Sequence, residues 1–258
     1  MKITLLGTGA PYPDPQRNAP GFLLEHDEVP YLIDCGGGVC HQLAKIGCPG
    51  AKLDNIFISH IHIDHCVEFP ALVFSSYLTG KEGSFHLFGP AGVKHWVEST
   101  FNTTYDFAPQ MMRDLRNKEI SVITQEVESG KIFEQDGLVV EAEPVEHGFP
   151  TLAYKFTANG KSVVFSGDTQ PCAGLTKIAQ GADLLIIECS FPEDMGIKPN
   201  HLIPSQVGRI AQAAKAKKVL LVHLFPFCHG KEEAILAEIK KHYSGPVEIG
   251  QDLQVMEV

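Results

Sequence analysis

Three histidines and an aspartate fall within six positions of the segment ISHIHIDHC, residues 58–66. They are His60, His62, Asp64 and His65, and they directly follow an apolar run. In an extended chain, side chains two positions apart point to the same side, so His60 and His62 would address one point. A helix beginning near Asp64 would carry Asp64 and His65 to a neighbouring point. Imidazole and carboxylate groups so arranged are typical metal ligands.

Three further candidate ligands stand at the ends of other predicted strands. His147 follows LVVEAEPVE, Asp168 follows SVVFSG, and His223 follows KVLLV. Ligands cluster at such positions in α/β folds because the ends of adjacent strands converge. Together the five imidazoles and two carboxylates suit Zn²⁺, with Mn²⁺ or Fe²⁺ as alternatives. Two such ions about 3.5–4 Å apart can bridge an oxygen and generate a hydroxide near neutral pH.

The elements that must position these residues alternate between strands and helices. Short apolar runs bounded by Gly or Pro predict strands over 2–6, 21–25, 30–34, 54–59, 85–88, 120–127, 138–146, 151–157, 162–166, 183–188 and 218–223, with two more at the C-terminus. Helices are predicted over 37–46, 64–77, 91–101, 172–180, 204–216 and 231–242. Residues 104–118 show little periodicity and fit either a short helix or a loop. No linker is evident, which predicts one α/β domain over 1–258 with mixed sheets.

Composition narrows the class of protein. A hydrophobic content of 44% with no run of about 18 apolar residues predicts no membrane helix. The N-terminus lacks the features of a signal peptide, so a cytoplasmic location is expected. The seven cysteines are odd in number and form no CxxC pair, which argues against a disulfide framework or a cysteine zinc ribbon. A net charge of −10 disfavours a polyanion such as tRNA as partner.

The pattern His60-x-His62-x-Asp64-His65 resembles the HxHxDH motif of the metallo-β-lactamase superfamily. The resemblance covers nearly the whole chain, including the segments LLGTGAPYP, LIDCGGG, VEHG, FSGDT, IIEC and LVHLFP. The N-terminal GTGxPxP and the segment NHLIPSQVGRIAQAAKAKKVLLVH are similar to the ribonuclease Z and phosphodiesterase branch. This resemblance implies a four-layer αββα sandwich, in which two mixed β-sheets are flanked by helices.

The resemblance also implies a role for each candidate residue. It implies two metal ions, the first held by His60, His62 and His147, the second by Asp64, His65 and His223, with Asp168 between them. His201 matches a histidine that stabilises charge or protonates the leaving group. Asp64 would also orient the nucleophile, and Asp34 would brace the loops.

The favoured expectation is a phosphodiesterase that uses a metal-bridging hydroxide on a small or cyclic phosphodiester. The alternative is a ribonuclease Z-type endonuclease that processes tRNA 3′ ends. That activity usually depends on a basic, glycine-rich arm, which residues 66–146 lack. The segment GTGAPYPDPQR also fits relatives that hydrolyse aryl sulfates, and a lactonase is a weaker candidate. A non-enzymatic binding module would be expected to have lost some of the seven ligands. Relatives are often dimers, so the resemblance is compatible with a homodimer.

Overall fold

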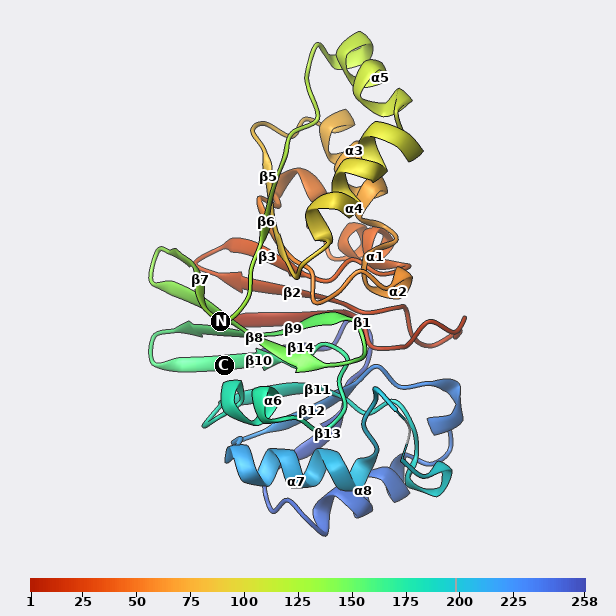
Figure 1. Cartoon of the computed structure of the whole chain (residues 1–258), viewed down its shortest axis with the longest axis vertical. Coiled ribbons are helices and arrows are strands. Elements are labelled where there is room, and N and C mark those ends of the chain that lie inside the picture. Colours follow the sequence, from red (N-terminus) through yellow and green to blue (C-terminus); the bar gives the residue numbers. More distant parts are fainter. Residues whose placement is uncertain (198) are drawn as a thin grey trace.

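Two seven-stranded β-sheets pack face to face in the computed structural model, which describes residues 1–197 and 199–258 (Figure 1). In spatial order, the first sheet consists of β14 (Val255–Glu257), β1 (Lys2–Gly7), β2 (Gly21–His26), β3 (Val29–Ile33), β4 (Asn55–Phe57), β5 (Phe85–Gly89) and β6 (Val122–Glu126). The second consists of β13 (Val247–Ile249), β12 (Val219–Val222), β11 (Leu184–Glu188), β10 (Lys161–Phe165), β9 (Pro150–Ala158), β8 (Leu138–Glu146) and β7 (Gly130–Gln135).

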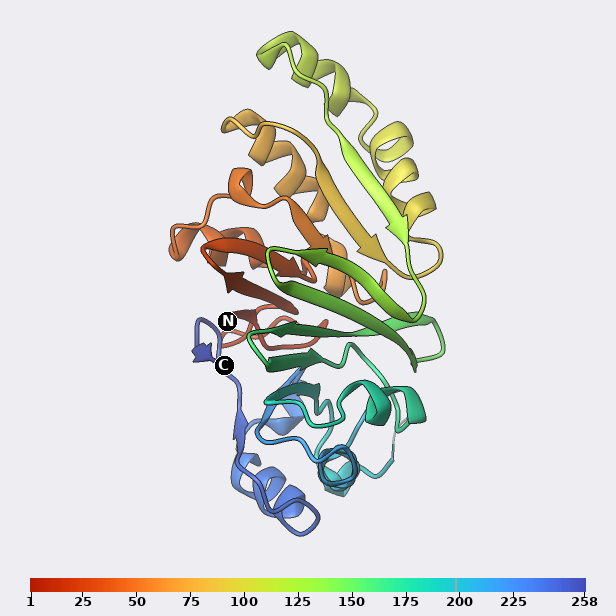
Figure 2. The same ribbon diagram turned by 90° about the vertical axis from the view of Figure 1, so that its left-hand side faces the viewer.

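Helices cover the outer face of each sheet. The first sheet is covered by α1 (Val39–Lys45), α2 (Ile63–Cys66), α3 (Phe69–Leu78), α4 (Val93–Ser99) and α5 (Phe107–Arg116). The second is covered by α6 (Ala173–Ile178), α7 (Pro204–Ala214) and α8 (Glu232–Lys240). Single turns complete the list: η1 (Gly50–Lys52), η2 (Thr100–Thr104), η3 (Glu193–Met195) and η4 (Pro226–Cys228). Figure 2 shows these layers from the side and places α5 at the end of the molecule farthest from α8.

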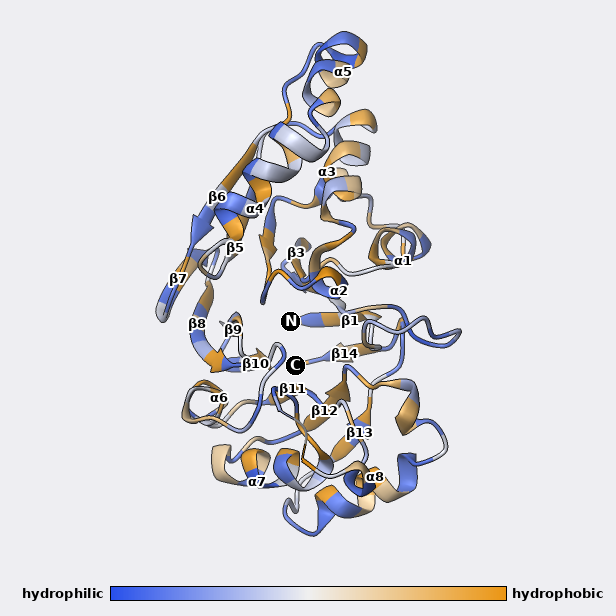
Figure 3. Cartoon of the chain, turned by 45° about the vertical axis from the view of Figure 1, so that its right-hand side comes forward, coloured by the Kyte–Doolittle hydropathy of each residue, from blue (hydrophilic) through white to orange (hydrophobic). Residues whose placement is uncertain are grey.

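Short apolar runs form strands here because most strands are buried on both faces. In β2, Phe22 and Leu24 point into the core between the sheets, whereas Leu23 points toward the helices. Strand β12 is hydrophobic along its whole length, and the helices alternate between hydrophobic and hydrophilic residues (Figure 3). Strands β3 to β6 and β10 to β13 pair in parallel, and the remaining neighbours pair antiparallel. The predicted four-layer αββα sandwich of mixed sheets is therefore confirmed.

The structure differs from the predicted elements at two places and decides a third. The helix expected over 64–77 is divided into α2 and α3, because Pro70, in the first turn of α3, could not donate a backbone hydrogen bond within one continuous helix. Strand β7 was not predicted. Within 104–118, the ambiguous segment, the chain forms helix α5. Among the described residues, no helix is long and apolar enough to cross a membrane. The prediction of one domain over 1–258 stays a prediction.

Candidate metal centre

The seven predicted ligands meet where strands of both sheets end. His60 and His62 follow β4 and precede α2, which carries Asp64 and His65. The other three follow strands of the second sheet: His147 after β8, Asp168 after β10 and His223 after β12. A hydrogen bond from the backbone N–H of Leu152 in β9 to the carbonyl of Ser59 (2.9 Å) ties the two sheets together at this point.

The ligand atoms form two adjacent groups. One group is His60, His62 and His147, and the other is Asp64, His65, Asp168 and His223. Within each group the candidate ligand atoms lie within 4.8 Å of one another. These two groups bring together the seven residues that the sequence analysis named. Two further sets overlap them: His147, Asp168 and His201, and Glu188, His201 and His223. The assignment of each residue to one of two ions stays a prediction.

Asp168 lies between the two groups. Its Oδ2 atom is 3.9 Å from Nε2 of His60 and 3.8 Å from Nε2 of His147, both in the first group. The same oxygen is 3.2 Å from Nε2 of His223, and Oδ1 is 3.4 Å from Nε2 of His65, both in the second group. One carboxylate therefore faces both groups, which is the geometry that a ligand shared by two cations requires.

Four of the imidazoles are oriented by protein contacts through Nδ1. His65 donates from Nδ1 to the carboxylate of Asp34 (2.8 Å), and His147 donates from Nδ1 to the carbonyl of Asn200 (2.8 Å). The Nδ1 atoms of His60 and His223 contact serine hydroxyls, those of Ser59 at 3.0 Å and Ser190 at 2.9 Å. A histidine that binds a metal commonly fixes its second nitrogen in this way.

Two of the opposite nitrogens lack a hydrogen-bond partner among the described residues. The Nε2 atoms of His60 and His65 are buried, and neither has a hydrogen-bond partner among the described residues. A buried polar atom normally has a partner, so these two atoms indicate that the cluster binds something. The donor set of nitrogens and carboxylate oxygens fits divalent metal ions.

Burial and charge shift the pKa values of the candidate ligands in different directions. Burial lowers the pKa of His65, but the carboxylates of Asp168 and Asp34 outweigh it and raise that pKa well above its usual range. Burial and the neighbouring imidazole of His65 hold the pKa of His60 well below its usual range, so His60 is neutral and keeps a lone pair on Nε2. Burial by itself raises the pKa of Asp168. The imidazoles of His223 and His65 outweigh that effect and hold the pKa well below its usual range. Asp168 is therefore ionised.

The backbone around the centre is held in uncommon conformations. Asp34 has φ 56° and His223 has φ 58°, both in the left-handed region that non-glycine residues seldom occupy. Gly36 contacts the backbone of α2 so closely that an added Cβ would lie 2.0 Å from the carbonyl oxygen of Asp64. These positions fix the strand-end loops against one another. The predicted bracing role of Asp34 agrees with its hydrogen bonds to His65 and Ser59.

His201 lies beside the seven residues and contacts a carboxylate of its own. Its Nδ1 atom is 3.1 Å from Oε1 of Glu188 and 4.0 Å from Oδ2 of Asp168. Burial lowers the pKa of His201, but hydrogen bonding and charge from Glu188 more than offset this, so the pKa is raised. With Nδ1 facing Glu188, Nε2 is the nitrogen left to meet a substrate. The structure therefore places His201 beside the cluster, and its role as a proton donor stays a prediction.

Glu188 is a residue of this site that the sequence analysis missed. Its buried carboxylate accepts hydrogen bonds from the backbone N–H groups of Thr169 (2.7 Å) and Leu202 (3.1 Å) and from the hydroxyl of Ser190 (2.5 Å). These contacts fix Glu188 and, through it, His201. Its position in the sequence could have identified it. Glu188 is an acidic residue at the end of an otherwise apolar strand, as the candidate ligands are.

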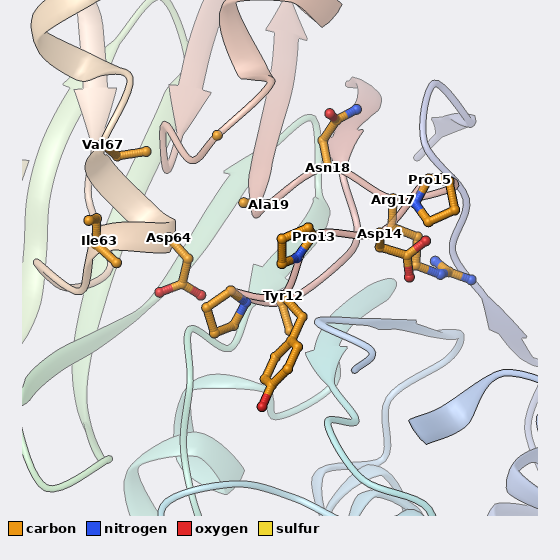
Figure 4. Close-up of a pocket in the computed structure, with 13 residues that line it drawn as sticks. Tyr12, Pro13, Asp14, Pro15, Arg17, Asn18, Ala19, Ile63, Asp64 and Val67 are labelled. Atoms are coloured by element: carbon orange, nitrogen blue, oxygen red, sulfur yellow. The ribbon is translucent and has the colours of Figure 1, made fainter. Parts of the chain in front are cut away.

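An open cleft leads to the cluster at Asp64. It has a volume of about 640 Å³ and lies between the loop after β1 and helix α2. In Figure 4, the carboxylate of Asp64 lies between Ile63 on one side and Tyr12 on the other. Ile63 and Val67 expose 70% and 46% of their surface, so one wall of this cleft is apolar. A substrate can reach the centre from solvent along this route.

Two β-sheets are packed together here, and histidines and aspartates from their strand ends lie below an open cleft. This arrangement is typical of a class of metal-dependent hydrolases. Residues 30–224 match the model of the β-lactamase superfamily domain. The chain therefore belongs to the metallo-β-lactamase superfamily, and it is a ribonuclease Z-like hydrolase of that fold.

The chain is similar to curated relatives and to solved structures along its full length. The chain is 30% identical to a ribonuclease Z of Mycobacterium bovis (strain BCG / Pasteur 1173P2), with 100% of this chain and 98% of that protein covered. It is similar in structure to the metallo-β-lactamase fold protein YhfI of Bacillus subtilis, with a TM-score of 0.84, 25% identity, and 100% and 99% coverage. The short form of human tRNase Z has a TM-score of 0.80 at 23% identity, with 100% and 99% coverage.

Proposed function

We propose that the chain is a dinuclear metal-dependent phosphodiesterase that acts on a nucleotide phosphodiester. The observation that carries this proposal is the position of Asp168, whose carboxylate faces both groups of ligand atoms. In the proposal, two ions, zinc in the first instance, are held by His60, His62 and His147 on one side, by Asp64, His65 and His223 on the other, and by Asp168 between them. When bound, these ions would activate water and neutralise charge on the phosphoryl oxygens.

The protein residues would divide the remaining work. Asp64, which lines the cleft, would orient the attacking water. His201 would give a proton from Nε2 to the leaving oxygen, and Glu188 would hold the ring of His201 in place through Nδ1. A leaving alkoxide needs such a proton because it is a strong base, whereas an aryl oxide leaves more readily without one.

The comparisons favour RNA as the source of the phosphodiester. Full-length relatives carry the name ribonuclease Z, and the human tRNase Z has the same fold. Cleavage at the 3′ end of tRNA, which the sequence analysis kept as the alternative, is therefore the first candidate. The expectation of a small or cyclic phosphodiester rested on the net charge of −10 and on the lack of a basic, glycine-rich arm in residues 66–146. The net charge describes the whole chain rather than the cleft.

A small nucleotide ester remains the second candidate because one observation favours it. Among the residues that line the cleft, Arg17 is the one cation, and its Nη1 atom donates to Thr8 Oγ1 (2.7 Å) and to the carbonyl of Gly250 (2.6 Å). Arg17 is thus engaged in holding the loop after β1. Binding of a long polyanion usually relies on several cations, whereas a mononucleotide ester needs few.

A side-by-side assay tests the proposed reaction and separates the two candidates. The zinc-loaded protein would be given bis(p-nitrophenyl) phosphate, p-nitrophenyl sulfate and a 3′-extended tRNA. We expect cleavage of the phosphodiester with negligible cleavage of the sulfate. Trimming of the tRNA would identify RNA as the substrate, and an intact tRNA would identify the small ester. A preference for the sulfate would contradict the proposal.

The contact between Asp34 and His65 predicts a change in metal affinity. We expect Asp34→Asn to weaken zinc binding at one of the two positions by about 10–100-fold, because the carboxylate that orients the imidazole is lost. Asparagine tolerates the left-handed backbone at this position, so the fold should be kept. The measurement is a zinc titration against a chromophoric chelator.

A matched control for this variant is Asp27→Asn. Asp27 also has a left-handed backbone (φ 48°), but its side chain is 74% exposed. Equal zinc affinities in Asp34→Asn and Asp27→Asn would show that Asp34 does not support a ligand.

A further inference from the structure

Four aromatic rings from three different loops pack together beside the candidate metal centre. They are Tyr12 after β1, Phe191 after β11, and Phe225 and Phe227 after β12, and together we call them the aromatic platform. The rings of Phe191 and Phe225 are stacked with centroids 4.7 Å apart, and those of Phe225 and Phe227 are parallel to within 5° at 6.3 Å. Tyr12 packs at an angle against Phe225 (5.6 Å) and Phe227 (6.0 Å).

The aromatic platform reaches from the catalytic residues to the cleft. The ring centroid of Phe225 lies 5.7 Å from that of the candidate ligand His223 and 6.0 Å from that of His201. At the other end, Tyr12 lines the same cleft as Asp64 (Figure 4). A group attached to the scissile phosphate would therefore lie close to these rings.

Two of the rings are exposed to solvent. Tyr12 is 53% exposed and Phe227 is 44% exposed, although burying aromatic surface is favourable. Tyr12 stands between Pro11 and Pro13, and Phe227 follows Pro226 in a single helical turn, so the backbone at both rings is stiff. A cluster that served only to pack the loops would not need to present two large rings to solvent.

Contacts between the loops hold the platform ready before substrate arrives. Asp14, two residues after Tyr12, lies against His229, two residues after Phe227, with 2.8 Å between Oδ2 and Nε2. The backbone N–H of Leu224 donates to the carbonyl of Thr8 (3.2 Å), which joins the same two loops next to the centre. Because the rings are fixed in advance, a ligand that stacks on them loses little free energy in ordering the protein.

We propose that the aromatic platform binds a nucleobase of the substrate by stacking, next to the scissile phosphate. This inference rests on the proposed phosphodiesterase function and names the group that the cleft recognises. Stacking on aromatic side chains accepts any base, because every base has a planar face. It also explains how a cleft with few available cations could hold a nucleotide.

The test compares two esters with the same leaving group. Thymidine 5′-(p-nitrophenyl phosphate) carries a base, and methyl p-nitrophenyl phosphate does not. We expect the zinc-loaded enzyme to have a KM for the thymidine ester lower by on the order of tenfold, the size of one base stacked on an aromatic ring. In a Tyr12→Leu/Phe227→Leu double variant, we expect this KM ratio to approach one. Phe107→Leu, which removes an exposed ring on α5, should keep the ratio.

A binding measurement separates failure of this inference from failure of the proposed function. We expect uridine 5′-monophosphate to bind more tightly than ribose 5-phosphate by calorimetry, with upfield shifts of the base protons in NMR spectra that the double variant lacks. If neither ester is cleaved, the proposed function fails while this measurement still tests the platform. Equal binding of the two monophosphates, or an unchanged KM ratio in the double variant, would overturn the platform.

A 3′-extended tRNA with an abasic residue beside the cleavage site would show whether the stacked base belongs to RNA or to a small ester. If the base belongs to RNA, the intact 3′-extended tRNA is cleaved faster than the abasic one by wild type, and the double variant loses that difference. If the base belongs to a small ester, neither tRNA is cleaved and the KM ratio above still holds. Equal cleavage of both tRNAs by wild type would contradict stacking of an RNA base.

Discussion

Asp168→Ala is expected to lose metal and activity together. Its carboxylate faces both groups of ligand atoms, so removing it takes one ligand from each proposed ion. It also removes a negative charge that would offset the repulsion between the two cations. Loss of several kcal/mol of transition-state stabilisation would lower kcat/KM for bis(p-nitrophenyl) phosphate by more than about 10³-fold. Zinc content and kcat/KM would be measured on the same preparation.

A control for Asp168→Ala removes an aspartate on a neighbouring loop. Asp194→Ala deletes a carboxylate that is 66% exposed and that, in the described part of the chain, pairs with Lys231, so it should retain both metal and activity. Circular dichroism of both variants would show whether the fold is kept. Full activity in folded Asp168→Ala would contradict the shared-ligand role.

His201→Ala is expected to separate metal binding from catalysis. His201 contacts Glu188 and is not one of the seven proposed ligands, so we expect the variant to keep its zinc. Turnover should fall by about 10²–10⁴-fold for an alkyl leaving group, which needs a proton, and by much less for p-nitrophenolate, which does not. The measurement is kcat across a series of phosphodiesters whose leaving groups differ in pKa.

The dependence on leaving group distinguishes a proton donor from a residue that only packs. A general loss of structure would slow all esters alike and lower zinc content. His242→Ala, which removes a half-buried histidine after α8, should leave the whole series unchanged. The same fractional loss for every leaving group in His201→Ala would rule out His201 as the acid.

The sequence predicted the ligand cluster because its members occupy strand ends. His147, Asp168 and His223 lie more than 80 residues from the HxHxDH segment, yet each follows an apolar run, and strand ends converge in an α/β fold. The same argument would have found Glu188, since it ends the apolar run of β11. The rule therefore failed there only because it was applied to histidine and aspartate alone.

The contacts that orient the ligands could not be predicted in the same way. Ser59, Asn200 and Ser190 support imidazoles through hydrogen bonds, but serine and asparagine are common in loops and carry no pattern of their own. Asn200, for example, meets His147 across 53 positions of sequence. Only the folded arrangement brings such pairs together.

Two errors in the elements have local physical causes. Strand β7 lies at the edge of its sheet with most of its residues exposed, so GKIFEQ shows no alternation of apolar and polar residues. Helix α2 ends where Glu68 turns to accept hydrogen bonds from the backbone N–H groups of Gly38 (2.8 Å) and Cys40 (2.6 Å). This contact between distant segments, together with Pro70, divides the predicted helix.

The number of divalent ions bound per chain tests the central claim most directly. The protein would be stripped with a chelator, dialysed against zinc at a known free concentration, and analysed by inductively coupled plasma mass spectrometry. The proposed arrangement of His60, His62, Asp64, His65, His147, Asp168 and His223 predicts two tightly bound zinc ions per chain, and fewer in Asp168→Ala. Binding of no zinc, or an equal stoichiometry in both proteins, would contradict a dinuclear centre built on Asp168.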